Sequence, residues 1–337
     1  MHAPHHPLPR VGGGRARSYS DVCRLADRLA AELRELVLPH IGAAWSRGLS
    51  GRAAGGDTTF AIDEVAEAHV EQFMAGTNLP VALYSEDRGL VTKPGADWTF
   101  IVDPIDGTRP AVAGLEAACV SVAVASGAGE PVMDDVHHAV VVEIKEGGTF
   151  TADRGKGVSV RRVDGQTRVV TLSAVTDLSR VFWTIGFRGR PAAELVVVLG
   201  ELIDTSSVDG GVFDLGSATY GMTRLLTGQL DAYVDVGPRM LEIAPGVEKR
   251  FRQVGKGAIL NNSPHDVAAS TLILQEGGCM VTDAAGRSLG ERPLMGSDAA
   301  HQMSVIASTG PELHAALIDV VARGMGRLEE YCRRGRP

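Results

Sequence analysis

The segment that decides the fold reads Trp98-Thr-Phe-Ile-Val-Asp103-Pro-Ile-Asp106-Gly107-Thr108. Its apolar, β-prone first half predicts a buried strand, and this strand runs directly into two acids, a glycine and a threonine. Two carboxylates three positions apart around a proline-fixed turn can converge on one hard cation, with a backbone carbonyl between them as a further ligand. Asp103, the Ile105 carbonyl and Asp106 therefore make a candidate metal site.

The end of this segment also suits an anion. Gly107 lets a ligand approach the backbone closely, and Pro110 fits the first turn of a helix. Backbone N–H groups near Gly107 and Thr108 can therefore cradle a phosphate. The plainer interpretation, which stays open here, is a polar turn in which Asp106 caps the helix.

On both sides of this segment, helical and strand patterns alternate along the chain. Helical periods are found at about 19–40, 63–74, 191–200, 217–227 and from Ser263 onward. Strand patterns are found near 81–84, 98–102 and 232–235, and two β-rich runs at 117–124 and 139–152 predict an antiparallel meander. This alternation predicts a layered sandwich of the α+β or α/β class.

The domain organisation is expected to be simple. Residues 1–17 lack the apolar stretch of a secretory signal and are rich in histidine, proline and glycine, so they predict a disordered extension. Residues 18–337 predict one domain, with an N-terminal α+β half over about 18–160 and a C-terminal α/β half over about 161–337.

Composition excludes several classes of protein. Apolar residues make up 44% and charged residues 22% of the 337 positions, and no apolar run approaches the ~20 residues of a membrane-spanning helix. The four cysteines are far apart with no C-x-x-C pair, which favours a reducing cytoplasm over a disulfide framework. A net charge of −8 opposes nucleic-acid binding, and a small anionic substrate then requires bound cations to reverse the local field.

The motif Asp-Pro-Ile-Asp-Gly-Thr resembles the central signature of the inositol monophosphatase-like superfamily, which includes fructose-bisphosphatases and nucleotide 3′-phosphatases. Further segments resemble family motifs in the family's order, at 57–63, 84–87, 215–218, 230–232 and 265–278. The resemblance covers roughly residues 26–307. One short motif recurs by chance, whereas the ordered set is specific.

The resemblance implies a fold, an activity and a set of site residues. A first Mg²⁺ is expected at Glu86, Asp103 and the Ile105 carbonyl, a second at Asp103, Asp106 and Asp266, and a third, weaker ion near Glu86. Metal-activated water is expected to attack phosphorus, oriented and deprotonated by a pair formed by Thr108 and Asp63. The substrate is expected to bind against Asp106, Gly107, Thr108, Gly216, Ser217 and Ala218.

Each of these residues also has a structural interpretation. Asp266 fits a capping box that begins at Ser263, Asp63 and Ser217 lie where helix caps would, and Glu86 alone is a loop acid. A phosphatase with a nucleophilic aspartate in D-x-D-G-T is disfavoured, because the two acids here are three positions apart. A nicotinamide enzyme is disfavoured because no strand is followed by G-x-G-x-x-G.

Departures from the family pattern bear on the substrate. Arg109 and Pro110 follow Thr108 where the family usually has asparagine and phenylalanine, and His265 stands where it has tryptophan. Seven positions before Asp266, where inositol monophosphatases carry a glutamate that binds ring hydroxyls, this chain has Ile259. Inositol itself is therefore not the expected substrate.

Three functions remain in order of expectation. The first is a phosphatase for a small sugar or cyclitol phosphate. The second is a bisphosphate or nucleotide phosphatase, in which the basic segment 237–256 folds over the substrate through Arg250 and Arg252, although a solvated basic loop is the simpler interpretation. The third is a non-catalytic, metal-dependent phosphate binder. The expected partner is a small phosphorylated metabolite, with no nucleic acid and no membrane. The cysteine pattern favours the cytoplasm, and the family favours a homodimer.

Overall fold

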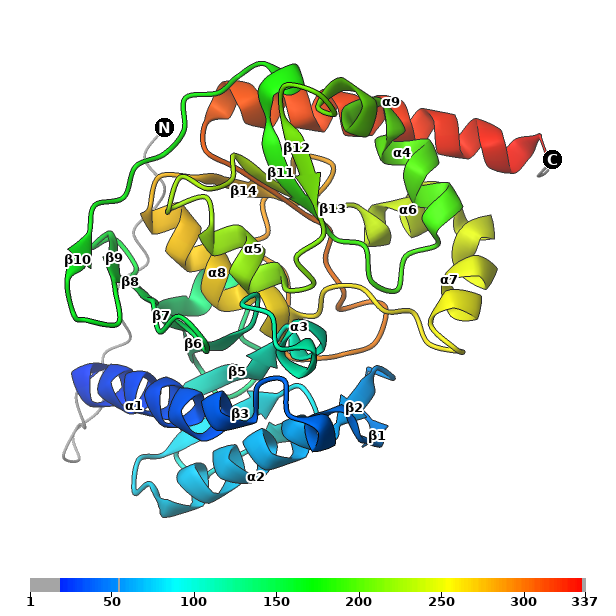
Figure 1. The fold of residues 1–337 in the computed structure, drawn as a ribbon. Helices are drawn as coiled ribbons and strands as arrows, with labels where there is room; N and C mark the ends of the chain where they lie inside the picture. Colours follow the sequence, from blue (N-terminus) through cyan, green and yellow to red (C-terminus); the bar gives the residue numbers. More distant parts are fainter. Residues whose placement is uncertain (1–18, 54, 335–337) are drawn as a thin grey trace.

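Two β-sheets with helices packed on their faces form most of the chain (Figure 1). The structure is a computed structural model that describes residues 19–53 and 55–334. Helices and sheets alternate in layers, so the predicted layered sandwich is confirmed. The predicted disordered extension at 1–17 lies outside the described residues.

The larger sheet takes its strands from the first half of the chain. They are β3 (Val81–Ser85), β4 (Gly89–Val91), β5 (Trp98–Asp106), β6 (Cys119–Ser126), β7 (Val136–Glu143), β8 (Thr149–Asp153), β9 (Val158–Arg161) and β10 (Thr167–Arg168). Their order is β10-β9-β8-β7-β6-β5-β3-β4, and only the β3–β5 pair is parallel. The predicted antiparallel meander is confirmed, and the run at 139–152 spans the turn that joins β7 to β8.

A β-bulge in β5 explains how this strand presents its acids. Asp103 lies opposite Ser121 and Asp106 opposite Cys119, so three steps along β5 match only two along β6. Residues three apart on a regular strand point to opposite faces, and one extra residue restores them to the same face. Pro104, which cannot donate to the ladder, falls within this irregularity. The bulge therefore lets both acids project to one side.

Helices cover both faces of the larger sheet. Helices α1 (Tyr19–Val37) and α2 (Ala61–Gly76) pack on one face, and α5 (Ala218–Thr223) and α8 (Pro264–Glu276) pack on the other (Figure 1). β5 serves both layers, because Phe100 and Val102 join the apolar cluster under α1 and α2 while Ile101 joins the cluster under α8. A strand buried on both faces reads as a continuous apolar run, as the sequence shows.

The predicted helices in these layers are confirmed with shifted ends. α1 stops at Val37 and continues as a 3₁₀ turn over Leu38–His40, because Pro39 cannot donate the next helical hydrogen bond. The pattern at 217–227 holds a helix only as far as Thr223.

Ahead of α2, β1 (Leu49–Arg52) and β2 (Thr58–Phe60) form a two-stranded ribbon. After β5, the short helix α3 (Thr108–Ala113) follows directly, with Gly107 as its N-cap.

The smaller sheet comes from the second half of the chain. Its strands are β11 (Phe182–Ile185), β12 (Gly211–Phe213), β13 (Ala232–Asp235), β14 (Met280–Thr282) and β15 (Val305–Ser308), in the order β12-β11-β13-β15-β14. Helices α4 (Ala192–Thr205) and α9 (Pro311–Arg333) pack together and share an apolar cluster with β11, β13 and β15. α9 begins with Pro311 at its first turn, yet the sequence analysis did not predict it.

The basic segment 237–256 is not the loop that the sequence suggested. It forms α6 (Gly237–Ile243), a 3₁₀ turn at Pro245–Val247 and α7 (Glu248–Val254). Its arginines pair with acids close by: Arg239 with Glu242, Arg252 with Glu248, and Arg250 with Glu194. These three arginines are therefore already paired with carboxylates.

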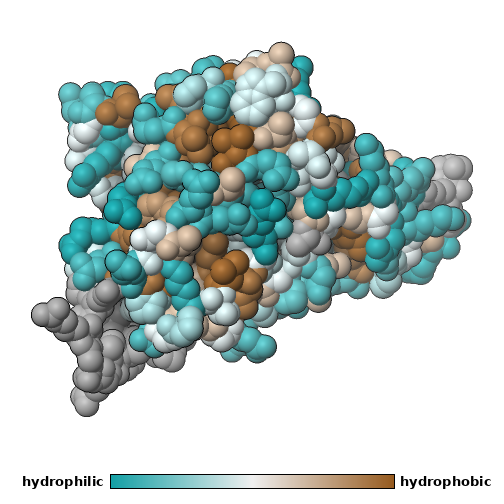
Figure 2. All heavy atoms as spheres, turned by 90° about the horizontal axis from the view of Figure 1, so that it is seen from below, coloured by the Kyte–Doolittle hydropathy of each residue, from teal (hydrophilic) through white to brown (hydrophobic). Residues whose placement is uncertain are grey.

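Within the described residues, no helix combines the length and the apolar character needed to cross a membrane. On the face shown in Figure 2, hydrophobic residues form separate patches among hydrophilic ones.

Candidate active site

Three buried acids meet where the larger sheet faces α8. Asp103 and Asp106 project from the bulge in β5, and Asp266 comes from the first turn of α8. One carboxylate oxygen from each lies within 4.8 Å of the others. These are the three side chains that the sequence analysis assigned to a second metal ion. The structure brings them together.

A second group of possible ligands shares Asp103. Glu86, in the turn after β3, lies with Asp103 and His265 so that one ligand atom of each is within 4.8 Å of the others. The sequence analysis placed Glu86 and Asp103 in one site but did not consider His265 as a ligand. The Ile105 carbonyl, its third expected ligand, accepts a hydrogen bond from the Thr108 hydroxyl at 3.1 Å.

Electrostatics shows that this cluster suits a cation. Burial, followed by repulsion from neighbouring carboxylates, raises the pKa of Glu86 and of Asp103 well above their usual range. Burial and repulsion from Asp266 raise the pKa of Asp106 to about 7. Hydrogen bonds from the Thr219 N–H and the Ser217 hydroxyl oppose this rise but do not cancel it. Buried acids that repel one another are stabilised by a bound divalent ion.

The donor set fits a divalent metal ion. Five of the six donor groups are oxygens, the ligand type that Mg²⁺ prefers. His265 adds a nitrogen: its ring is buried, and Nδ1 has no hydrogen-bond partner among the described residues. A buried histidine that is clustered with two carboxylates and has an unpartnered ring nitrogen fits a metal ligand, and imidazole suits Zn²⁺ better than Mg²⁺.

The expected pair of Thr108 and Asp63 is present. The Thr108 hydroxyl lies 3.0 Å from Asp63 Oδ1, while Asp63 Oδ2 accepts from the Phe60 N–H at 2.7 Å. Burial is the main reason that the pKa of Asp63 rises to about 7. One oxygen of Asp63 therefore caps α2, and the other faces Thr108.

The expected substrate-binding residues Gly216, Ser217 and Ala218 lie at the start of α5, next to Asp106. The Ser217 hydroxyl donates to Asp106 at 2.8 Å and accepts from the Tyr220 N–H at 3.0 Å. Gly216, Ser217 and Ala218 line one pocket together with Asp106. Ser217 thus caps α5, as the structural interpretation proposed, and also joins the acid cluster.

Gly107 is required by close contact on two sides. Its φ is +94°, and a Cβ at this position would lie 2.4 Å from the Ala117 carbonyl oxygen and 2.9 Å from the Ser217 Cβ. Any side chain here would be strained and would push α3 away from the start of α5.

Two adjoining pockets open onto these acids, and the sequence analysis missed the residue between them. Both pockets are lined by Arg188 and Asp266; one also contains Glu86 and the other Asp106. Arg188 pairs with Asp57, and the other Asp57 oxygen accepts from Arg109 at 2.9 Å. Nothing local in the sequence marks Arg188, because its partner lies 131 positions away.

The position expected to replace the ring-binding glutamate proves to be in the core. Ile259 is 8% exposed and belongs to the apolar cluster of the smaller sheet. Asp214 lines the pocket that contains Asp106, whereas Asp235 at the end of β13 is fully buried and pairs with Arg190, which also lines this pocket. The count of seven positions from Asp266 does not reach the end of β13, because α6 and α7 lie between that strand and α8.

Glu67 holds the Glu86 loop and was also missed. Its carboxylate accepts from the Ser85 hydroxyl at 2.9 Å and from the Asp87 N–H at 3.2 Å. Burial is the main reason that its pKa rises to about 7. A helix acid that binds both neighbours of Glu86 positions this ligand from behind.

Comparison with known proteins agrees with this geometry. The family model described as the inositol monophosphatase family matches residues 19–325. A fructose-1,6-bisphosphatase/inositol-1-monophosphatase of Methanothermobacter thermautotrophicus is 25% identical over 309 residues, covering 88% of this chain and 95% of the relative. An inositol-1-monophosphatase of Mycobacterium leprae is 29% identical over 237 residues, covering 66% and 76%.

Solved structures share the fold. The extragenic suppressor protein SuhB of Bartonella henselae aligns with a TM-score of 0.66 and 19% identity, covering 90% of this chain and 99% of that one. The Thermotoga maritima IMPase aligns with a TM-score of 0.64 and 21% identity, covering 91% and 99%.

The fold and the matched family define a phosphatase, in which the clustered acids could hold a metal ion. The chain belongs to the inositol monophosphatase family, a metal-dependent family, and the enzyme class expected from the sequence, a phosphoric monoester hydrolase, is confirmed.

The acid cluster makes a prediction for the metal-free protein. The pKa values of Asp63 and Asp106 rise from 3.8 to about 7 on folding, so the folded state binds more protons than the unfolded state between these values. Stability should therefore fall as pH rises from about 4 to 7, and added Mg²⁺ should restore it at neutral pH. Urea unfolding midpoints, measured in chelator at several pH values, test this decline in stability. Asp103→Asn should make the decline with pH smaller. A wild-type stability that does not fall over this range would contradict the prediction.

Proposed function

We propose that this protein is a Mg²⁺-dependent phosphomonoesterase that hydrolyses a small sugar or cyclitol phosphate with an activated water molecule. The observation that carries the proposal is that Asp103 is shared by two groups of ligands, next to the Thr108–Asp63 pair and the Ser217 hydroxyl. Relatives named as inositol monophosphatases and fructose-bisphosphatases support the substrate class.

The proposal assigns each side chain a task. Glu86, Asp103, His265 and the Ile105 carbonyl would hold one divalent ion, and Asp103, Asp106 and Asp266 would hold a second. Bound ions would neutralise phosphate charge and lower the pKa of coordinated water.

The remaining residues would transfer the proton and orient the phosphate. Asp63 is suited to accept a proton at neutral pH because its pKa is about 7, and the Thr108 hydroxyl, 3.0 Å away, would pass that proton from the attacking water. The start of α5 at Ser217 would orient the phosphate against the acids through its hydroxyl and the backbone beside it.

A second candidate, a substrate with two anionic groups, is favoured by Arg188. Its side chain is 33% exposed and lines both pockets, where it is held by Asp57. A guanidinium binds a phosphate or carboxylate through two parallel hydrogen bonds, so a second anion on the substrate can displace Asp57 from Arg188. In contrast, neither Arg250 nor Arg252 lines these pockets.

Phosphate release from a panel of metabolites tests the substrate class. The panel contains sugar monophosphates, cyclitol monophosphates, sugar bisphosphates and nucleotide bisphosphates, each with Mg²⁺ and with chelator. Turnover of the monophosphates only with Mg²⁺ supports the first proposal. A strong preference for bisphosphates supports the second, and no release from any compound contradicts both.

Arg188→Ala separates the two substrate classes. If Arg188 binds a second anion, we expect kcat/KM for a bisphosphate to fall about 10- to 100-fold, the loss for a hydrogen bond to a charged group, with a much smaller change for a monophosphate. Arg252→Ala is the matched control, because Arg252 is exposed and pairs with Glu248 on its own helix. Equal losses of kcat/KM on both substrates would show that Arg188 does not discriminate between bisphosphates and monophosphates.

The cellular setting belongs to the same proposal. A small phosphorylated metabolite is the proposed partner, in the cytoplasm, with a homodimer as the assembly that the family favours. Light scattering on the purified protein tests the assembly.

A further inference from the structure

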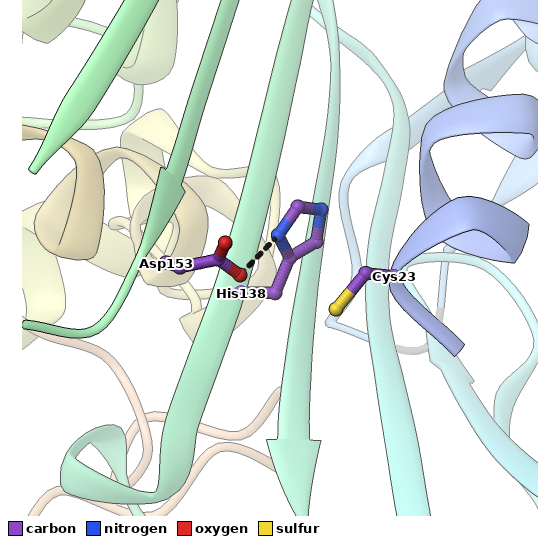
Figure 3. Close-up of side chains that lie close together, drawn as sticks. All are labelled: Cys23, His138 and Asp153. Carbon is purple, nitrogen blue, oxygen red and sulfur yellow. Dashed lines mark hydrogen bonds and ion pairs between the residues drawn. The ribbon is translucent and has the colours of Figure 1, made fainter. Parts of the chain in front are cut away.

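A cluster of polar side chains lies between α1 and the larger sheet, away from the active site. Tyr19, Cys23 and Asp27 are spaced four residues apart, so they share one face of α1. This face meets His138 on β7 and Asp153 on β8, which are directly opposite each other in the ladder. Figure 3 shows Cys23, His138 and Asp153 converging from the three elements.

The three side chains are close enough to share an ion. One ligand atom from each of Cys23, His138 and Asp153 lies within 4.8 Å of the others, and the His138 Nδ1 to Asp153 Oδ1 distance is 3.1 Å. Donors around a tetrahedral Zn²⁺ lie at about 2.0–2.3 Å from the ion, and therefore about 3.5 Å from one another. Modest side-chain rotation brings the sulfur into range.

The surroundings match those of a metal-bound histidine. His138 Nε2 lies 2.9 Å from Asp27, and a carboxylate on the far nitrogen is the usual support of a ligating imidazole. An ion between His138 and Asp153 would meet Nδ1 and leave this support in place. The cysteine and histidine are buried, while the side chains of Asp27 and Asp153 are 45% and 33% exposed, which gives ions a path inward.

The cluster can also balance the charge of such an ion. His138 lies between two carboxylates, with Nε2 2.9 Å from Asp27 and Nδ1 3.1 Å from Asp153. A metal-bound Cys23 thiolate and the Asp153 carboxylate would together supply two negative charges, which match the charge of a divalent ion.

We propose that Cys23, His138 and Asp153 form a second metal site, for a thiophilic divalent ion of the Zn²⁺ class. Thiolate and imidazole select such ions over Mg²⁺, so this site differs chemically from the carboxylate centre. The two sites are separate, because His138 pairs with Val124 while the active-site bulge pairs with Cys119 and Ser121, five and three residues along β6. The ion ties α1 to β7 and β8.

Cobalt spectroscopy on the full chain tests the site. Co²⁺ is added to chelator-treated protein in excess Mg²⁺, which competes for the proposed carboxylate centre, and the near-ultraviolet absorption of a cobalt–thiolate bond is recorded. We expect the band to saturate at one Co²⁺ per chain and to disappear when Zn²⁺ is added. Cys23→Ser should abolish the band, and His138→Gln should weaken Co²⁺ binding at least about tenfold.

Matched controls separate this site from other thiols and from loss of fold. Cys332→Ser, at the exposed cysteine of α9, should keep the band, and circular dichroism should show that Cys23→Ser is folded. Asp153→Asn, which leaves Cys23 in place, serves as a second variant if Cys23→Ser fails to fold, and should also weaken binding. No band in the wild type, or an undiminished band in folded Cys23→Ser, overturns the proposal. In that case the cluster is only a hydrogen-bonded anchor for α1, and the proposed phosphatase function is unaffected.

Discussion

Replacing Asp103 with asparagine is expected to lower phosphatase turnover by more than about 100-fold, because Asp103 is the one side chain common to both groups of ligands. Loss of a supporting residue behind a metal ligand costs about 10- to 100-fold, and loss of a shared ligand should exceed that. Steady-state phosphate release over a range of Mg²⁺ concentrations measures the effect. A variant within tenfold of wild-type turnover at saturating Mg²⁺ would remove Asp103 from the mechanism.

Stability supplies the control for this substitution. In the metal-free protein Asp103 is 1% exposed, next to other carboxylates whose repulsion, after burial, raises its pKa. Asparagine has similar size and no charge, so the metal-free variant should melt at or above the wild-type temperature at pH 7 while losing activity. A variant that is inactive and also much less stable would show misfolding instead of a lost ligand.

The sequence predicted the acids that the structure brings together, but not the strand register that orients two of them. The order of the motifs in the chain pointed to Asp63, Glu86, Asp103, Asp106 and Asp266, because each lies at the end of a helix or strand, where local signals are strong. The bulge that turns Asp103 and Asp106 to one side depends on the register between β5 and β6. Register depends on how two strands pair, so it cannot be predicted from the sequence of either strand alone.

The residues that were missed share a cause. Arg188 and Asp57 meet across 131 positions, and Glu67 reaches Ser85 and Asp87 from another element. A partner that is distant in sequence has no periodicity and no neighbouring motif to mark it.

The substrate pocket shows the same limit. Ile259 was expected by a count of seven positions from Asp266, but α6 and α7 lie between β13 and α8, and Ile259 belongs to the apolar cluster of the smaller sheet. Asp235, at the end of β13, pairs with Arg190, which lines the pocket. Short helices such as α6 and α7 depend on tertiary contacts more than on propensity, so their sequence was interpreted as a loop.

Replacing Thr108 with valine is expected to lower kcat about 10²- to 10⁴-fold with little change in KM, the range for loss of a positioned proton-transfer group. Valine keeps the shape and removes the hydroxyl that lies 3.0 Å from Asp63 and 3.1 Å from the Ile105 carbonyl. Thr108→Ser, which keeps the hydroxyl, should retain most of the activity. Equal rates for the valine and serine variants would exclude the hydroxyl from the chemistry.

A double variant shows whether Thr108 and Asp63 act as one unit. Asp63→Asn keeps an oxygen for the Phe60 N–H, 2.7 Å away, so the start of α2 is preserved while the proton acceptor is lost. If the proton passes from water through Thr108 to Asp63, either change breaks the same step, and the double variant should be no slower than the slower single variant. Losses that multiply would mean that the two residues contribute independently, with Asp63 serving α2 and Thr108 serving the substrate.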